Sequence, residues 1–301
     1  MTKSKYHATV WHSGLAEWKD TISTLPGRAF LSVVFTWDLP AAHQRAAFLD
    51  TMGYEVYAGG PAVALNPDYL KPLAHVNGHQ IDALPHHNPQ ATFTSRGCIR
   101  RCKFCAVPKI EGELTELLDW EPRPIVCDNN LLACSRAHFD KVIDSLKPVR
   151  GVDFNQGLDA RLLTKYHAQR LAELKLHKVR LAWDHVCNEQ VVYDAIQTLR
   201  KAGIGKKAIK VYVLIGFDDT PQDAYYRLNT LKFGWGIDPN PMRYLPLDAM
   251  EKNSYVAPGW TDRQLRNLVR YFSRTRYLGA IPFDEYMRAP ADKPWLRRDV
   301  A

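Results

Sequence analysis

Short apolar runs separated by amphipathic stretches recur along most of the chain. The runs predict strands at 91–95, 124–128, 151–155, 178–184, 209–216 and 242–247. Apolar residues at helical spacing predict helices at 112–119, 131–146, 162–175, 188–202 and 220–233, and a last helix at 261–276. Because strands that alternate with helices form parallel βαβ units, and six such units follow one another, we expect an α/β fold built around a barrel or partial barrel.

The first 88 residues carry one more strand–helix–strand pattern. FLSVVFTW at 30–37 predicts a strand, and the helix after it begins near Asp38 and stops at Gly53. A second strand is expected at 54–58, and a polar stretch rich in His and Pro comes after it. We therefore predict a small α/β segment at 1–88, a barrel core at 89–250 and a C-terminal helical extension at 251–301.

Composition and charge narrow the function classes. The chain has 301 residues, of which 46% are hydrophobic and 24% charged, so it is expected to bury a core. No run of about 18 apolar residues occurs, which predicts no membrane span, and the N-terminus lacks a secretory signal, which predicts a cytoplasmic protein. The net charge of +8 favours an anionic partner, a requirement that a nucleic acid or a small anionic substrate would equally meet.

Three of the six cysteines, Cys98, Cys102 and Cys105, fall within eight residues. In a reducing compartment such a cluster predicts a metal site, because disulfides do not persist there. A structural zinc ion normally takes four protein ligands, whereas three thiolates on a four-iron cube leave one iron open to another ligand. The alternative is a zinc site completed by a distant residue, for which the candidates are His86, His87 and Cys127.

The residues around the cysteines suit such a site. The cysteines follow the first strand of the barrel-like region, and parallel α/β folds place their chemistry at the carboxyl ends of strands. Gly97 allows the backbone to turn tightly beside them. Positive charge next to thiolates comes from Arg96, Arg100, Arg101 and Lys103.

The motif Cys98-x3-Cys102-x-Phe104-Cys105 resembles the signature of the radical S-adenosylmethionine superfamily, including the aromatic residue before the last cysteine. The resemblance implies a partial (β/α)6 barrel, a [4Fe-4S] cluster on the three cysteines, and S-adenosylmethionine chelating the fourth iron. It implies an oxidoreductase-type reaction in which an electron from the cluster cleaves the cofactor and the resulting 5′-deoxyadenosyl radical abstracts hydrogen from substrate. It also implies an external electron donor of the flavodoxin or ferredoxin type.

The resemblance extends over about 90–250 and implies further residues of the cofactor site. After the second strand, Cys127-Asp128-Asn129-Asn130 is similar to the Asp-rich form of the family's amine-binding motif. Asp128, with Asn129 beside it, is thereby implied as a ligand of the cofactor's amino group. The alternative is that Asp128 caps the helix that follows.

The ends of the next three strands supply other candidates. Asn155 and Arg161 follow the third strand, where Arg161 is expected to pair with the cofactor carboxylate or else to lie on the surface. Asp184 ends the fourth strand and is expected to reach the ribose or sulfonium side, unless it caps a helix. Gly216 ends the fifth strand, which is similar to the family's glycine-containing strand near the adenine.

The segment 1–88 resembles a truncated, Rossmann-like cobalamin-binding domain of the kind that precedes some radical barrels. The Gly59-Gly60-Pro61 turn after a strand supports this likeness, but the Asp-x-His-x-x-Gly motif that supplies a cobalt ligand is absent. Cobalamin is therefore not expected. A cobalamin-dependent radical methyltransferase remains the alternative enzyme.

The substrate is open at the level of sequence, and no catalytic residue is predicted. The last predicted helix carries a stripe of arginines on one face: Arg263, Arg266, Arg270 and Arg274. Such a stripe either binds phosphates or is an ordinary solvated face. No second Cys-x2-Cys cluster occurs, which argues against a methylthiolating enzyme. A nucleotide or nucleic acid is the expected substrate, and the rival from another class is a non-catalytic zinc- or nucleic-acid-binding protein.

Overall fold

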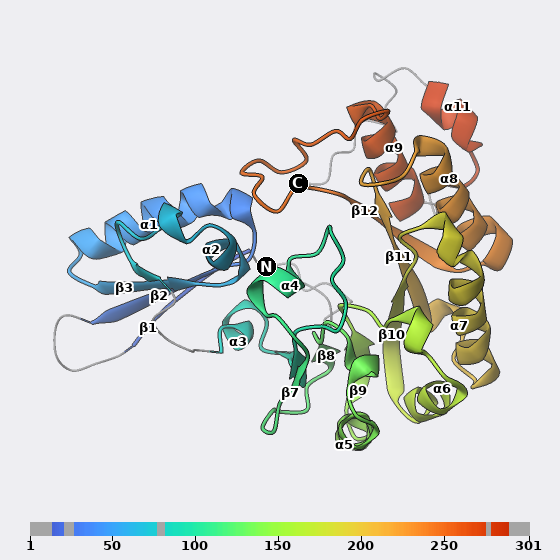
Figure 1. The fold of residues 1–301 in the computed structure, drawn as a ribbon, viewed down its shortest axis with the longest axis horizontal. Coiled ribbons are helices and arrows are strands. Elements are labelled where there is room, and N and C mark those ends of the chain that lie inside the picture. Colours follow the sequence, from blue (N-terminus) through green and yellow to red (C-terminus); the bar gives the residue numbers. More distant parts are fainter. Residues whose placement is uncertain (1–13, 21–26, 77–81, 275–277, 289–301) are drawn as a thin grey trace.

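The computed structural model describes residues 14–20, 27–76, 82–274 and 278–288, and these residues form two main sheets covered by helices (Figure 1). The predicted connector between the first two parts lies partly outside the described residues, at 77–81. Within the described ranges, no helix has the length and apolar character needed to cross a membrane.

A four-stranded sheet organises the N-terminal part. Its strands pair in chain order: β1 (Leu15–Lys19), β2 (Arg28–Val33), β3 (Glu55–Gly59) and β4 (His75–Val76). β1 runs antiparallel to β2, whereas the other neighbours are parallel. Alternate residues of β2 and β3 pack against α1 (Leu39–Thr51) and α2 (Pro61–Leu65) in a core of small and branched side chains. Asp38 directly precedes α1 as predicted, although its side chain makes no capping hydrogen bond.

A six-stranded parallel sheet organises the rest of the described chain. Its strands are β5 (Ala91–Thr92), β8 (Ile125–Val126), β9 (Arg150–Phe154), β10 (Lys175–Ala182), β11 (Ile209–Ile215) and β12 (Asp238–Arg243). They lie side by side in chain order, each parallel to its neighbours. Since β5 and β12 are its two edges, the sheet is open. The mixed α/β fold with a parallel sheet is as predicted.

Helices cover one face of this sheet. They are α5 (Arg136–Leu146), α6 (Lys165–Ala172), α7 (Glu189–Lys201), α8 (Pro221–Asn229) and α9 (Asp262–Ser273). Alternate strand residues such as Val179, Val211 and Val213 are fully buried against them in one large core. The helices cover one face of the sheet. The loops at the carboxyl ends of its strands are therefore the part of this unit that can form a site.

Two predicted elements differ in the structure. The strand expected at 242–247 lies at 238–243. Pro239 and Pro241 argued against a strand in the sequence, because proline lacks an N–H donor. An edge strand tolerates proline, and β12 is at the edge of the sheet. No helix forms at 112–119. Gly112 there has a left-handed backbone (φ +74°), and β7 (Thr115–Glu116) pairs antiparallel with β6 (Ser95–Arg96).

Short helices and long-range contacts complete the fold. The remaining helices are α3 (Leu84–His87), α4 (Val107–Ile110) and α11 (Phe283–Arg288). The hydroxyl of Thr36 donates to the carbonyl of Ala249, and Met250 packs on the core of the four-stranded sheet. The loop after β12 thus touches the N-terminal part, as Figure 1 shows.

Candidate functional site

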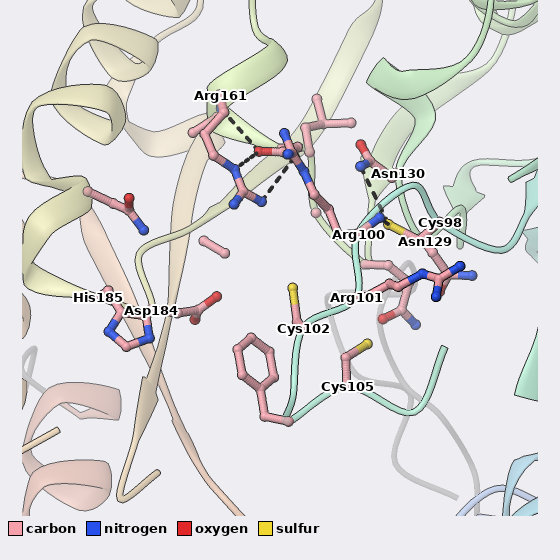
Figure 2. Close-up of a pocket in the computed structure, with 18 of the residues that line it drawn as sticks. Cys98, Arg100, Arg101, Cys102, Cys105, Asn129, Asn130, Arg161, Asp184 and His185 are labelled. Carbon is pink, nitrogen blue, oxygen red and sulfur yellow. Dashed lines mark hydrogen bonds and ion pairs between the residues drawn. The ribbon is translucent and has the colours of Figure 1, made fainter. Parts of the chain in front are cut away.

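A pocket of roughly 530 Å³ opens at the carboxyl ends of the parallel strands. This volume lies within the range of about 300–1,000 Å³ that small-molecule sites occupy. Its walls come from the cysteine loop after β6, the loop after β8, and the loops that follow β9, β10 and β11. Figure 2 shows the three cysteine thiols turned toward a space that Arg161, Asp184 and His185 face from the other side.

The cysteine loop owes its shape to Gly97. Its backbone is left-handed (φ +72°), and a Cβ atom there would lie 2.0 Å from the carbonyl oxygen of Glu113, so only glycine fits. The Cys98 N–H donates to the carbonyl of Gly112 at 3.3 Å. These contacts bend the chain back on itself and direct Cys98 into the pocket.

The carboxylate of Glu111 holds the same loop in place. One carboxylate oxygen pairs with Arg96 at 2.9 Å. The other accepts hydrogen bonds from the backbone N–H of Gly97 and from the amide of Asn129, both at 2.8 Å. Its side chain is only 12% exposed, so water screens these bonds little. Sequence reasoning missed Glu111, because no motif or period marks it.

All three predicted cysteines line the pocket, and none is in a disulfide. The sulfur of Cys98 accepts hydrogen bonds from the backbone N–H of Arg100 at 3.3 Å and from the side-chain amide of Asn130 at 3.6 Å. Iron–sulfur proteins direct N–H donors at the sulfurs of their clusters in the same way. Burial raises the pKa of the Cys102 and Cys105 thiols, so these two need a metal to become thiolates at neutral pH.

The three thiols face one pocket without forming a single-ion site among the described residues. Within the described residues, no group of three or more His, Cys, Asp or Glu side chains is arranged to hold one metal ion. A cube spreads its ligands over three iron atoms, so three thiolates around it stand farther apart than the ligands of one zinc ion. The pocket also leaves room beside the thiols for a second molecule.

The residues considered as a fourth zinc ligand lie elsewhere. His87 is buried with its Nε2 3.0 Å from the hydroxyl of Ser32, and His86 stacks on Trp18 with ring centroids 4.0 Å apart. Cys127 is 1% exposed, and burial raises its pKa to about 12. None of the three candidates lines the pocket. These three residues are therefore not placed to complete a zinc site with the pocket cysteines.

Asp128 does not take the role that the resemblance implies. Its carboxylate accepts hydrogen bonds from the backbone N–H of Thr94 at 2.6 Å, from the Thr94 hydroxyl, and from the Ser95 hydroxyl at 2.8 Å. It is 3% exposed and does not line the pocket. The helix-cap alternative is also wrong, since Ser135 caps α5. Asp128 instead fixes the turn between β5 and β6, directly before the cysteine loop.

Asn129 and Asn130 reach the pocket from the same loop. Asn129 is bonded to Glu111, and Asn130 points its amide at Cys98 (Figure 2). The carbonyl oxygen of the Asn130 side chain is buried without a partner among the described residues. A buried acceptor that lacks a donor is costly, so it is ready to accept a hydrogen bond from a ligand.

Asp159 joins two arginines across the pocket. Its carboxylate pairs with Arg161 at 2.7 Å and with Arg100 at 2.9 Å, and its side chain is 7% exposed. Burial opposes ionisation, but the two guanidinium groups hold the pKa of Asp159 below its ordinary value. Arg161, which is 46% exposed, lines the pocket and is oriented by this carboxylate. Asp159 also accepts the backbone N–H of Arg161 at the start of the short helix at 160–162.

Asp184 lines the opposite side, and His185 lies next to it. The carboxylate of Asp184 accepts a long hydrogen bond from the N–H of Leu214 at 3.4 Å. Burial raises the pKa of Asp184 above its ordinary value. Its side chain does not cap the short helix that follows, whose N-terminal residue is His185. A half-buried carboxylate with one weak partner is suited to accept hydrogen bonds from ligand hydroxyls.

Of Phe104, Asn155 and Gly216, which were also predicted at the cofactor site, only Phe104 lines the pocket. Phe104 lines the pocket and meets Phe217 edge to face, with centroids 5.5 Å apart. Asn155 does not line it, and its carbonyl accepts the Tyr212 hydroxyl at 2.7 Å. Gly216 does not line it either. A Cβ there would lie 2.7 Å from Leu265, so this glycine admits helix α9 rather than a ligand.

Two arginines of the predicted stripe on α9 have partners within the chain. Arg263 donates to the carbonyl of Met287 at 2.9 Å, and Arg266 pairs with Asp262 at 2.8 Å. One guanidinium nitrogen of Arg270 is buried without a hydrogen-bond partner among the described residues.

Comparison with known proteins gives a distant similarity. The chain is 23% identical over 208 residues to the ribosomal protein uS12 methylthiotransferase RimO of Chlorobium limicola. The match covers 65% of this chain and 44% of the relative, so the chain spans less than half of that protein's length. No protein-family model matches the chain.

Proposed function

We propose that this protein is a radical S-adenosylmethionine enzyme whose parallel sheet is a partial (β/α)6 barrel. The observation that carries the proposal is the pocket itself. Three cysteines with the family's spacing turn their thiols into one space at the carboxyl ends of consecutive parallel strands. The distant similarity to a methylthiotransferase supports the superfamily in general. The methylthiotransferase reaction itself is not carried over, because a second cysteine cluster is absent from the sequence.

The cluster would be held by Cys98, Cys102 and Cys105. Asn130 and the N–H of Arg100 would then stabilise the Cys98 sulfur and tune the reduction potential of the cluster. When bound, the [4Fe-4S] cluster supplies the electron that cleaves S-adenosylmethionine to a 5′-deoxyadenosyl radical able to abstract hydrogen from a substrate. The electron donor would be an external flavodoxin- or ferredoxin-like protein.

The other walls would orient S-adenosylmethionine. Arg161 offers a guanidinium to the cofactor's carboxylate. The amides of Asn129 and Asn130 replace Asp128 as the polar groups near the methionine end. Asp184 accepts from the ribose hydroxyls, and Phe217 packs on the adenine.

The substrate would be anionic. The net charge of +8, together with the exposed Arg101 and Lys103 at the pocket, favours a nucleotide or nucleic acid over a neutral molecule. A cobalamin-dependent methyl transfer and a zinc-binding role are the other outcomes that an experiment has to distinguish.

Anaerobic reconstitution with iron and sulfide tests the proposal. We expect about four iron atoms per chain and release of 5′-deoxyadenosine when the reduced protein meets S-adenosylmethionine. The variants Cys98→Ala, Cys102→Ala and Cys105→Ala should each lose the cluster. Cys187→Ala is the matched control, because Cys187 is exposed and lies outside the pocket. One zinc atom per chain with no nucleoside product would refute the proposal.

A further inference from the structure

Arg227 on α8 is a fully buried arginine that lies behind the pocket without lining it; its side chain is 0% exposed. One guanidinium nitrogen donates to the carbonyls of Trp183 and Asp184, both at 2.8 Å. A second nitrogen pairs with the carboxylate of Asp219, and the third donates to the carbonyl of Asp223 at 3.3 Å. All three guanidinium nitrogens therefore have partners within the protein.

These bonds join two loops that are distant in sequence. Trp183 and Asp184 follow β10, whereas Asp219 lies in the turn between β11 and α8. The other oxygen of Asp219 accepts the N–H of Gly216 at 2.8 Å, which fixes the start of that turn. A single arginine thus sets the separation between the end of β10 and the turn after β11.

Both loops carry pocket residues. Asp184 comes from the first, and Phe217 and Asp218 come from the second. Because Arg227 donates to the backbone carbonyl of Asp184, a shift of the guanidinium moves the backbone that carries this carboxylate. A shift of Asp219 moves Phe217, two residues away, relative to Phe104.

Removing one partner from such a buried pair leaves the other charge without water or a counter-ion. Lysine in place of Arg227 would keep the charge but lose the planar fork that reaches two carbonyls and a carboxylate at once. Arginine is therefore required here for geometry as well as for charge.

We propose that Arg227 is a positioning residue for the cofactor pocket, acting through Asp184 and Phe217 to hold the two strand ends at the separation that S-adenosylmethionine binding requires. This inference rests on the proposed function for its ligand. Its structural half, the coupling of the two loops, is testable in the chain without any cofactor.

The first test is hydrogen–deuterium exchange on the full chain free of cluster and cofactor, comparing Arg227→Lys with Arg170→Lys. Arg170 on α6 is a matched control, because it is 15% exposed and likewise binds both a carboxylate and a backbone carbonyl, those of Asp140, outside the pocket. In Arg227→Lys we expect exchange to rise about tenfold at the amides of Leu214 and Gly216, the loss of roughly one charged hydrogen bond. The control should leave these amides unchanged.

If Arg227→Lys does not fold, Asp219→Asn replaces it, since it removes the ion pair and keeps the side-chain shape. An exchange pattern that is unchanged, or equal in the Arg227 and Arg170 variants, would overturn the inference.

The second test uses reconstituted protein. Arg227→Lys should raise the KM for S-adenosylmethionine about tenfold while kcat changes less, because a misplaced pocket weakens binding first. A lower melting temperature with unchanged KM would show that Arg227 is only structural. Absence of iron in the wild-type chain would refute the proposed function and leave the exchange result standing.

Discussion

The two sides of the pocket are built in opposite ways. The cysteine wall, formed by residues 95–130, consists of short strands and loops that Gly97 and Glu111 hold in place. The strand-end wall, formed by the loops after β9, β10 and β11, follows regular βα units. It is fixed by the buried Arg227–Asp219 pair and by the partly exposed Arg100–Asp159 pair.

The difference lies in the sequence distance over which each wall is held. Glu111 reaches Gly97 and Asn129 across 14 and 18 residues, within one connected stretch of chain. Arg100 reaches Asp159 across 59 residues, and Arg227 reaches Trp183 across 44. The cysteine wall is therefore a local device that a short motif can mark, whereas the strand-end wall exists only after the parallel units have assembled.

The largest effect is expected at Gly97. Alanine there adds left-handed strain to a contact of 2.0 Å with a carbonyl oxygen, so Gly97→Ala should lower the free energy of unfolding by about 3 kcal/mol or more. The matched control is Gly112→Ala. Gly112 has a similar φ of +74°, but no atom lies within 4 Å of the position that its Cβ would take. It should cost only about 1–2 kcal/mol. Urea denaturation measures both, and equal losses would contradict a steric role for Gly97.

A smaller effect is expected when the carboxylate under the cysteine loop is made neutral. Glu111→Gln places an amide where three donors converge, which should cost about 2 kcal/mol and reduce iron incorporation. Glu113→Gln is the control, because that side chain is 92% exposed and should change neither quantity. Full iron loading in the Glu111 variant would show that the cysteine wall does not depend on this residue.

The smallest effect is expected at Asp159 in the strand-end wall. Since the pKa of this carboxyl is below its ordinary 3.8 in the fold, its ion pairs stabilise the protein above pH 3.8 and are lost as the pH falls through the lower folded value. Asp159→Asn should lower stability by about 1 kcal/mol at neutral pH, because both arginines are partly exposed. The gap to wild type should close in acid. A gap that stays constant with pH would mean that the ion pairs contribute nothing.

The sequence predicted most of what local pattern encodes. Strands β9 and β11 were found because their apolar residues alternate or run together, and the helices between them because of their period. The helix at 112–119 was wrong because pairing with β6 overrides local propensity. The position of β12 was misjudged because two prolines hide an edge strand.

The candidate site divides along the same line. The cysteines and Phe104 were found by spacing, and Arg161 and Asp184 by their place after a strand. Asp128 was assigned to the wrong partner, because a carboxylate that follows a strand can turn toward a neighbouring loop as easily as toward the pocket. No sequence pattern points to the buried Arg227, since its partners are backbone carbonyls 43 and 44 residues away.

The contact between Gly216 and Leu265 decides how this protein can be cut and recombined. Because Gly216 directly follows β11 and has no side chain, α9 lies directly on the sheet beside the pocket, and its leucines belong to the same core as the strands. A fragment that stops at residue 250 would leave that core uncovered. Shortened versions for engineering or domain exchange should therefore keep the chain through α9. The first part of the predicted extension at 251–301 belongs structurally to the sheet.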